Sequence, residues 1–228
     1  METFADKAIL FFENLHLDAL LPDDVEVMNP FLNPETMEVN RQFYQKFYND
    51  SNKRIFILGI NPGRFGAGIT GLCFTDPVRL EKELELPNPF PVMTELSSRY
   101  VYDLIAEYGG VKKFYSNFYL GAVCPLGFVR NGKNLNYYDD KKLEKSVEPF
   151  IIETLWQQIN LGAAREVCIC LGEGANYKYF YKLNEKHKFF EQIIPLAHPR
   201  YIMQYKLRRK HFYVDAYMEV LKQCEKYI

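Results

Sequence analysis

Four short apolar runs separated by helix-length segments constrain the fold of this 228-residue chain more than any other feature. Runs of this length and composition are typical of buried strands. Strands that alternate with helices form a mainly parallel sheet covered on both faces. We therefore expect an α/β protein with one domain over 1–228, built as a three-layer α/β/α fold around a central, mainly parallel four-stranded sheet. The four runs are "RIFILGI" (54–60), "NFYLGAVCPLGF" (117–128), "EVCICL" (166–171) and "FFEQIIPLAHP" (189–199).

Apolar residues recur at helical spacing over much of the remaining chain. Thr94 is the expected N-cap of one helix, which the pair Gly109 and Gly110 would stop, and "RNGKN" at 130–134 is typical of a turn. Another helix is expected to begin after "GEG" at 172–174. The apolar spacing predicts further helices over 2–15, 34–47, 94–108 and 140–161, and an amphipathic helical tail over about 204–227.

Each predicted strand ends in an unusual short sequence. Because ligands bind at the carboxyl ends of parallel strands in open α/β sheets, we expect these ends to converge on one site. This expectation rests on the pattern alone. The four endings are Asn61-Pro62, Cys124-Pro125, Gly172-Glu173-Gly174 and His198-Pro199.

Charge and cysteine content narrow the functional classes. The formal net charge is −1, so a nucleic-acid partner would have to meet a local basic patch instead of a global basic field. The five cysteines are scattered without four-ligand spacing, so we expect reduced thiols, no metal and no cofactor. We expect an intracellular protein, cytoplasmic if bacterial, with no secretory signal and no membrane contact.

The segment "GINPGRFGAGITGLCF" at 59–74 follows the first predicted strand directly. It matches neither G-x₄-G-K-[ST] nor G-x-G-x-x-G, so a phosphate-binding loop is not predicted. A packing turn remains open, since that is the commonest use of glycine. A pocket is favoured because Asn61 stands where the backbone leaves the sheet, and the glycines allow a ligand to approach closely. Phe65 and Phe74 offer flat faces for a ring.

Two interpretations are open both for His198 and for the basic segment after it, "RYIMQYKLRRKH" at 200–211. A lone histidine after a strand is more often structural than catalytic, and a basic run is more often a solvated helix face. Basic residues beside bulky apolar ones also suit a segment that grips phosphates and enters a base stack. The position of this segment next to the expected pocket favours nucleic-acid binding.

Taken together, these motifs resemble the uracil-DNA glycosylase superfamily, and within it the single-strand-selective monofunctional uracil-DNA glycosylases. The first motif of that family reads like G-M-N-P-G-P-F-G with T-G-x-x-F soon after, which matches 59–66 and 70–74 here. "CPLGFVRNGKNL" at 124–135 resembles its C-P-L…G-R-N-L block, and His198-Pro199 its second motif. The resemblance spans about residues 25–210.

The resemblance implies a monofunctional glycosylase of base excision repair that flips uracil or a related deaminated base out of DNA and hydrolyses its N-glycosidic bond. Asn61 would orient the hydrolytic water, and His198 would hydrogen-bond the uracil O2 and stabilise the leaving base. Phe74 would stack on the base. No motif positions a lysine, so no lyase step is expected, and the protein is expected to be a monomer. The base pocket would comprise Ile60, Gly63, Phe65, Phe74 and Ala122, and the DNA contacts Arg64, Arg200, Tyr201, Lys206, Arg208 and Arg209.

Three positions depart from the family pattern. Ala122 stands where the family has an asparagine that reads the base, so other deaminated bases such as xanthine or hypoxanthine become candidates. Arg64 replaces a proline and adds a cation at the mouth of the pocket. "HPRYIMQYK" at 198–206 replaces the family's wedge sequence. Two alternatives therefore stay open: a non-catalytic binder of damaged or single-stranded DNA, and an enzyme that acts on free nucleosides.

Overall fold

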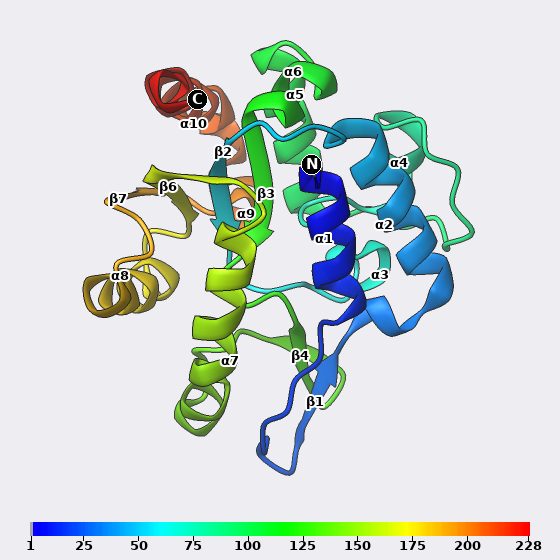
Figure 1. Cartoon of the computed structure of the whole chain (residues 1–228), viewed down its shortest axis with the longest axis vertical. Coiled ribbons are helices and arrows are strands. Elements are labelled where there is room, and N and C mark those ends of the chain that lie inside the picture. The colour runs from blue at the N-terminus through cyan, green and yellow to red at the C-terminus, as the bar shows by residue number, and fades with distance from the viewer. Residues whose placement is uncertain (1) are drawn as a thin grey trace.

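Four parallel strands form the central sheet of the computed structural model, which describes residues 2–228 (Figure 1). Their order across the sheet is β3-β2-β6-β7, so β2 lies between β3 and β6. Every residue of β2 is buried, as expected of a strand covered on both faces. The predicted parallel sheet is confirmed, with strands β2 (Arg54–Gly59), β3 (Phe118–Ala122), β6 (Ala163–Leu171) and β7 (Gln192–Leu196).

Helices cover both faces of this sheet and complete the expected three-layer α/β/α fold. Figure 1 shows α1 and α7 in front of the sheet and α9 behind it. None of the helices within residues 2–228 is long and apolar enough to cross a membrane. The helices are α1 (Phe4–Glu13), α2 (Pro34–Phe47), α3 (Ala67–Thr70), α4 (Pro77–Lys82), α5 (Leu96–Tyr108), α6 (Val111–Asn117), α7 (Lys141–Ile159), α8 (Ala175–His187), α9 (Pro199–Tyr205) and α10 (Lys210–Cys224).

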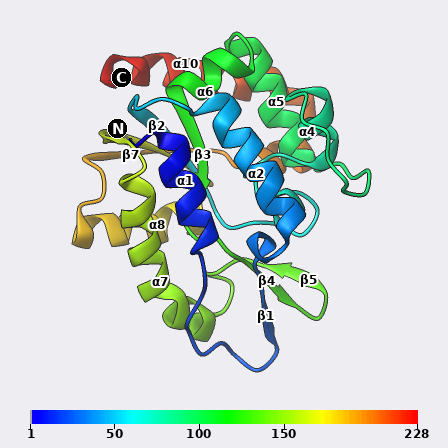
Figure 2. The ribbon, with the colours of Figure 1, turned by 45° about the vertical axis from the view of Figure 1, so that its right-hand side comes forward.

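A second, antiparallel sheet was not predicted from the sequence. It has the order β1-β4-β5 and consists of Val25–Met28, Gly127–Arg130 and Lys133–Leu135. Figure 2 shows it beyond the carboxyl ends of the central strands. Asn131 and Gly132 form the tight turn between β4 and β5 with φ values of 50° and 70°, which is typical of a two-residue hairpin. The predicted turn is therefore present, but strands of three or four residues give too short an alternation to recognise.

Two of the helix boundaries that differ from the sequence prediction lie next to the site described below. Helix α5 begins at Leu96, and the N-cap position belongs to Glu95 instead of Thr94. The C-terminal helical region begins earlier than expected, because His198 caps α9 and Pro199 occupies its first turn, a favoured position for proline. It is also divided: α9 ends at Tyr205, and a short 3-10 turn (Leu207–Arg209) precedes α10.

Two aromatic rings pack against a buried arginine at the amino end of β2. The Arg54 side chain is fully buried, and its guanidinium lies 4.6 Å from the Tyr48 ring centroid and 4.9 Å from that of Phe4. Its Nε donates to the Tyr115 carbonyl at 2.8 Å, and two terminal nitrogens donate to Asp50 at 2.9 and 2.8 Å. These bonds satisfy a charge that would otherwise be very costly to bury.

We expect Arg54→Met to lower the free energy of unfolding by about 3 kcal/mol, because the Tyr115 carbonyl and the Asp50 carboxylate lose their donors. Urea unfolding followed by circular dichroism measures this change. The matched control is Arg41→Met, whose guanidinium pairs with Glu13 on the surface and should contribute little. Equal midpoints for the two variants would contradict the structural role given to Arg54.

Candidate functional site

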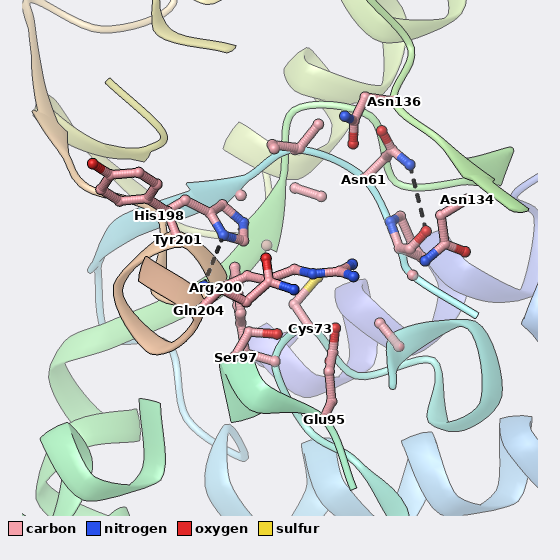
Figure 3. Close-up of a pocket in the computed structure, with 18 of the residues that line it drawn as sticks. Asn61, Cys73, Glu95, Ser97, Asn134, Asn136, His198, Arg200, Tyr201 and Gln204 are labelled. Carbon is pink, nitrogen blue, oxygen red and sulfur yellow. Dashed lines mark hydrogen bonds between the residues drawn. The ribbon is translucent and has the colours of Figure 1, made fainter. Parts of the chain in front are cut away.

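A cavity of about 350 Å³ opens at the carboxyl ends of β2 and β3 (Figure 3). Helix α9, the start of α5 and the segment with Asn134 and Asn136 close its other sides. Cavities of this kind at strand ends are the usual place for ligands in open α/β folds. Its lining residues are Gly59, Ile60, Asn61, Pro62, Gly63, Ala67, Cys73, Phe74, Glu95, Ser97, Gly121, Ala122, Asn134, Asn136, His198, Arg200, Tyr201, Gln204 and Tyr205.

Asn61 lies just past the end of β2, and both ends of its side-chain amide are bonded to the segment after β4. Its Oδ1 accepts the backbone N–H of Tyr137 at 3.2 Å, and its Nδ2 donates to the Leu135 carbonyl at 3.2 Å. These two bonds fix which amide atom faces which way. Since a carbonyl oxygen has two lone pairs, Oδ1 keeps one for a further donor such as a water.

His198 reaches the same cavity from the N-cap of α9. Its Nδ1 accepts the backbone N–H of Arg200 at 3.1 Å, so in the neutral ring the proton resides on Nε2. Burial and the nearby Arg200 guanidinium lower the pKa of His198 to about 4. The ring is therefore neutral at physiological pH and presents an N–H donor that does not depend on protonation.

The floor of the cavity is the ring of Phe74, which is buried. Its backbone adopts a left-handed conformation (φ 57°) that bulky residues rarely adopt. The ring lies against Gly59, where an added Cβ would come within 2.7 Å of the Phe74 Cζ. Gly59 therefore allows the aromatic ring to lie directly against the end of β2. The centroids of the Phe74 and His198 rings are 5.8 Å apart.

Phe65 does not line the cavity, contrary to the sequence prediction. The loop turns back after Gly63, whose carbonyl accepts the N–H groups of Gly66 and Gly68 at 3.3 and 2.9 Å. This turn directs Phe65 outward, where 42% of it is exposed and its ring lies 4.5 Å from the Arg64 guanidinium carbon. Arg64 also donates to the carbonyl of Gly132 in the β4–β5 turn. The other expected pocket residues, Ile60, Gly63, Phe74 and Ala122, all line the cavity.

Apart from Arg64, the expected DNA contacts divide into two groups. Arg200 and Tyr201 line the cavity, whereas Lys206, Arg208 and Arg209 are not among its lining residues. The first group belongs to α9 and the second to its end and the following 3-10 turn. The basic segment is therefore not one continuous helix face.

Sequence reasoning missed six polar or aromatic lining residues. Asn134 and Asn136 belong to "GKNLN", part of a block that resembles the family pattern, so that block held the signal. Gln204 and Tyr205 follow from α9 starting at Pro199, because they then lie in its last turn, about two turns along the helix from His198. Glu95 and Ser97 had no signal, because they follow a proline-rich stretch with no motif.

Cysteine and acidic side chains form no metal site in the described chain. Within residues 2–228, no group of three or more His, Cys, Asp or Glu residues is arranged to hold a metal ion. Cys73 is the one cysteine among the cavity-lining residues, and burial raises the pKa of its thiol to about 12. A thiol with that pKa is protonated and is a poor nucleophile.

Comparison with known proteins supports the fold and shows the family. The family model described as the uracil DNA glycosylase superfamily matches residues 45–222. The crystal structure of wild-type SMUG2 from Pedobacter heparinus is similar with a TM-score of 0.96 and 46% sequence identity, over 99% of this chain and 100% of that chain. A search of curated proteins gave no significant match. The chain therefore belongs to the uracil-DNA glycosylase superfamily.

Proposed function

We propose that this DNA glycosylase is monofunctional and hydrolyses the N-glycosidic bond of uracil, or a related deaminated base, after flipping the nucleotide out of DNA. One observation carries the proposal: the amide of Asn61 and the imidazole of His198 line the same cavity above the ring of Phe74. An aromatic floor with polar groups on two sides suits a single planar base.

In this proposal, Asn61 positions the water that attacks the sugar. An amide is too weak a base to remove a proton, but its free Oδ1 lone pair can hold a water in one orientation. The bonds to Leu135 and Tyr137 fix that orientation before the substrate arrives. Positioning is sufficient because the glycosidic bond breaks through a cationic, oxocarbenium-like sugar that even a neutral water attacks.

His198 stabilises the departing base. As the bond to the sugar breaks, negative charge develops on the base and concentrates on its carbonyl oxygens. The neutral ring offers its Nε2–H to O2, and a fixed donor at developing charge is an efficient catalytic device. The ring donates one proton in a hydrogen bond but does not need to transfer it.

The mouth of the cavity suits a DNA strand. Tyr201 and Tyr205 are 43% and 71% exposed, and such rings can stack on bases adjacent to the flipped one. Lys206, Arg208 and Arg209 follow directly along the chain and can neutralise phosphates. Flipping a nucleotide out of DNA costs a few kcal/mol, and the cost is smallest in single strands. Stacking and phosphate contacts of this kind have to offset that cost.

Hydrolysis without a lyase step is part of the proposal. A lyase step requires an amine that forms a Schiff base with the sugar, and among the described residues no lysine lines the cavity. The product is therefore an intact abasic site.

Oligonucleotides carrying uracil, 5-hydroxymethyluracil, xanthine or hypoxanthine, each single- and double-stranded, test the proposal. Strand scission is expected only after alkaline treatment of the product. Tight binding without scission on any base would instead support the non-catalytic DNA binder. That alternative is open because Ala122 stands where the family has a base-reading asparagine. Release of base from free nucleosides, unaffected by competing DNA, would support the nucleoside enzyme.

Asn61→Ala should lower the single-turnover rate on uracil DNA by about 10²–10³, because the attacking water loses its fixed acceptor. DNA binding measured by fluorescence anisotropy should stay within about twofold, since Asn61 contacts no phosphate in this proposal. Cleavage at the unchanged rate would remove Asn61 from the mechanism.

His198→Ala should lower the rate by about 10²–10³, whereas His198→Gln, which keeps a donor, should lose less. His16→Ala, on the exposed surface, is the matched control. Because the pKa of His198 is lowered to about 4, the wild-type rate should show no histidine-dependent limb between about pH 5.5 and about pH 8. A limb near about pH 6.5 that disappears in His198→Gln would show that the imidazolium is required instead.

The double variant Arg208→Gln/Arg209→Gln should weaken binding of single-stranded DNA and reduce the slope of log K against log salt by about 1.4, or about 0.7 for each lost phosphate contact. The matched control is Lys182→Gln/Lys186→Gln on α8, which removes two exposed charges away from the cavity. If the slope stays as in the wild type, Arg208 and Arg209 form a solvated surface only.

A further inference from the structure

Phe65 is an aromatic residue that neither the cavity nor the core uses. Its side chain is 42% exposed, and within residues 2–228 it belongs neither to the hydrophobic core nor to the partly buried residues packed against that core. It stands two residues after Gly63, which lines the cavity. A ring kept on the surface beside a binding cavity is available to a ligand that extends out of the cavity.

Arg64 joins this ring to the turn between β4 and β5. Its guanidinium carbon lies 4.5 Å from the Phe65 ring centroid, and a terminal nitrogen donates to the carbonyl of Gly132. Its backbone N–H donates to Oδ1 of Asn134 at 3.1 Å, and Asn134 lines the cavity. The loop and the turn therefore form one edge of the cavity mouth. We call this edge the hairpin rim and define it by Arg64, Phe65 and Lys133.

The hairpin rim carries two cations that no carboxylate neutralises. Arg64 and Lys133 are exposed, and neither forms an ion pair with any residue in 2–228. Other exposed cations, such as Arg41 and Lys141, do pair with glutamates. An exposed ring beside cations that are free to bind phosphate is the combination by which proteins hold single-stranded nucleic acid.

The hairpin rim lies on the opposite side of the cavity from α9. Figure 3 shows Asn134, to which the rim is bonded, across the cavity from Tyr201 and Gln204 of α9. A flipped nucleotide has one neighbour on each side in its strand, and flipping removes it from the stack with both. The exposed rings of α9 can take one of these neighbours. A strand that continues past the cavity meets the hairpin rim with the other.

We propose that the hairpin rim is a second DNA-binding surface, on which Phe65 stacks against the nucleotide that adjoins the flipped one on the side away from α9. Arg64 and Lys133 bind phosphates of the same stretch of strand. This role rests on the proposed function, because it requires a strand whose flipped base occupies the cavity. Arg64, which replaces a proline of the family pattern, thereby gains a use outside the cavity.

The first test is the affinity for a single-stranded oligonucleotide with a central 2′-fluorinated deoxyuridine, measured by fluorescence anisotropy. Fluorine destabilises the oxocarbenium-like sugar, so this substrate analogue stays intact. Phe65→Ala should raise Kd at least about fivefold, whereas Phe65→Trp, which keeps a stacking ring, should stay within about twofold of wild type. Tyr181→Ala on α8 is the matched control, since Tyr181 is 45% exposed and is not among the cavity-lining residues.

Two truncated oligonucleotides locate the contact. One ends at the flipped nucleotide on its 5′ side and the other on its 3′ side. The loss caused by Phe65→Ala should persist on one of them and disappear on the other, and Tyr205→Ala should show the reverse dependence. Equal losses for Phe65→Ala on both truncations, or no loss on the complete oligonucleotide, would overturn the assignment.

Salt dependence tests the two cations. Arg64→Gln/Lys133→Gln should reduce the slope of log K against log salt by about 1.4, or about 0.7 for each lost phosphate contact. An unchanged slope would remove the cations from the proposed surface. The single-turnover rate of Phe65→Ala on uracil DNA at saturating protein should stay within about threefold of wild type, because the ring does not touch the flipped nucleotide. A large rate loss with unchanged affinity would contradict a position outside the cavity.

The results also separate this surface from the proposed function. A wild-type protein that cleaves uracil DNA, with Phe65→Ala binding as tightly as wild type, would overturn the hairpin rim and leave the proposed function intact. A wild-type protein that cleaves no base, but loses affinity in Phe65→Ala on one truncation only, would support the rim and count against the proposed function. Thermal melting should be unchanged in each variant, since all three substituted side chains are exposed.

Discussion

The buried amide of Asn176, in the first turn of α8, joins the strand ends on which the rest of the site depends. Its Nδ2 donates to the carbonyl of Leu171 at 3.1 Å and contacts that of Gly59 at 3.5 Å. Its Oδ1 accepts the hydroxyl of Tyr137 at 2.7 Å. One side chain thereby links the carboxyl ends of β6 and β2 to the segment after β5. Such a network is strong where water is excluded, and costly if one member is lost.

The orientation of the Asn61 amide follows from that link. Tyr137 is anchored through its hydroxyl, and its backbone N–H in turn holds the Oδ1 of Asn61. The antiparallel sheet therefore serves the site, because β5 supplies the Leu135 carbonyl for the same amide. The central sheet brings Asn61 to the cavity, while the small sheet decides how its amide is turned. Preorganisation of this kind reduces the reorganisation needed when the substrate binds.

The electrostatic character of the cavity differs from that of its mouth. The chain carries a formal net charge of −1, so attraction to DNA has to be local, and the exposed cations after α9 are the proposed source of it. Inside, the same helix start keeps His198 neutral, since the Arg200 N–H occupies Nδ1 and its guanidinium opposes a second charge. In the proposed mechanism, one short segment thus supplies both a neutral donor for the base and a cation at the mouth of the cavity.

Most of the fold followed from the sequence, for identifiable reasons. The all-apolar run of β2 has a strong signal, and α2 begins and ends where its Asn-Pro start and apolar spacing indicate. The small sheet gave no such signal, since β5 has only three residues, two of them exposed. Phe65 was wrongly assigned to the pocket because a motif position gives spacing but not direction. The turn at Gly63 decides that direction, and it depends on backbone hydrogen bonds that no pattern shows.

The sequence by itself determined that Asn61 and His198 each follow shortly after a strand, because strand periodicity and proline positions are local properties of the chain. It also determined the family, through motifs of fixed spacing. Only the tertiary structure decided that the two side chains share one cavity with Glu95, which comes from a stretch without a motif. The physical reason is that hydrogen-bond partners distant in the chain, such as Asp76 for Glu95 and Leu135 for Asn61, orient these groups.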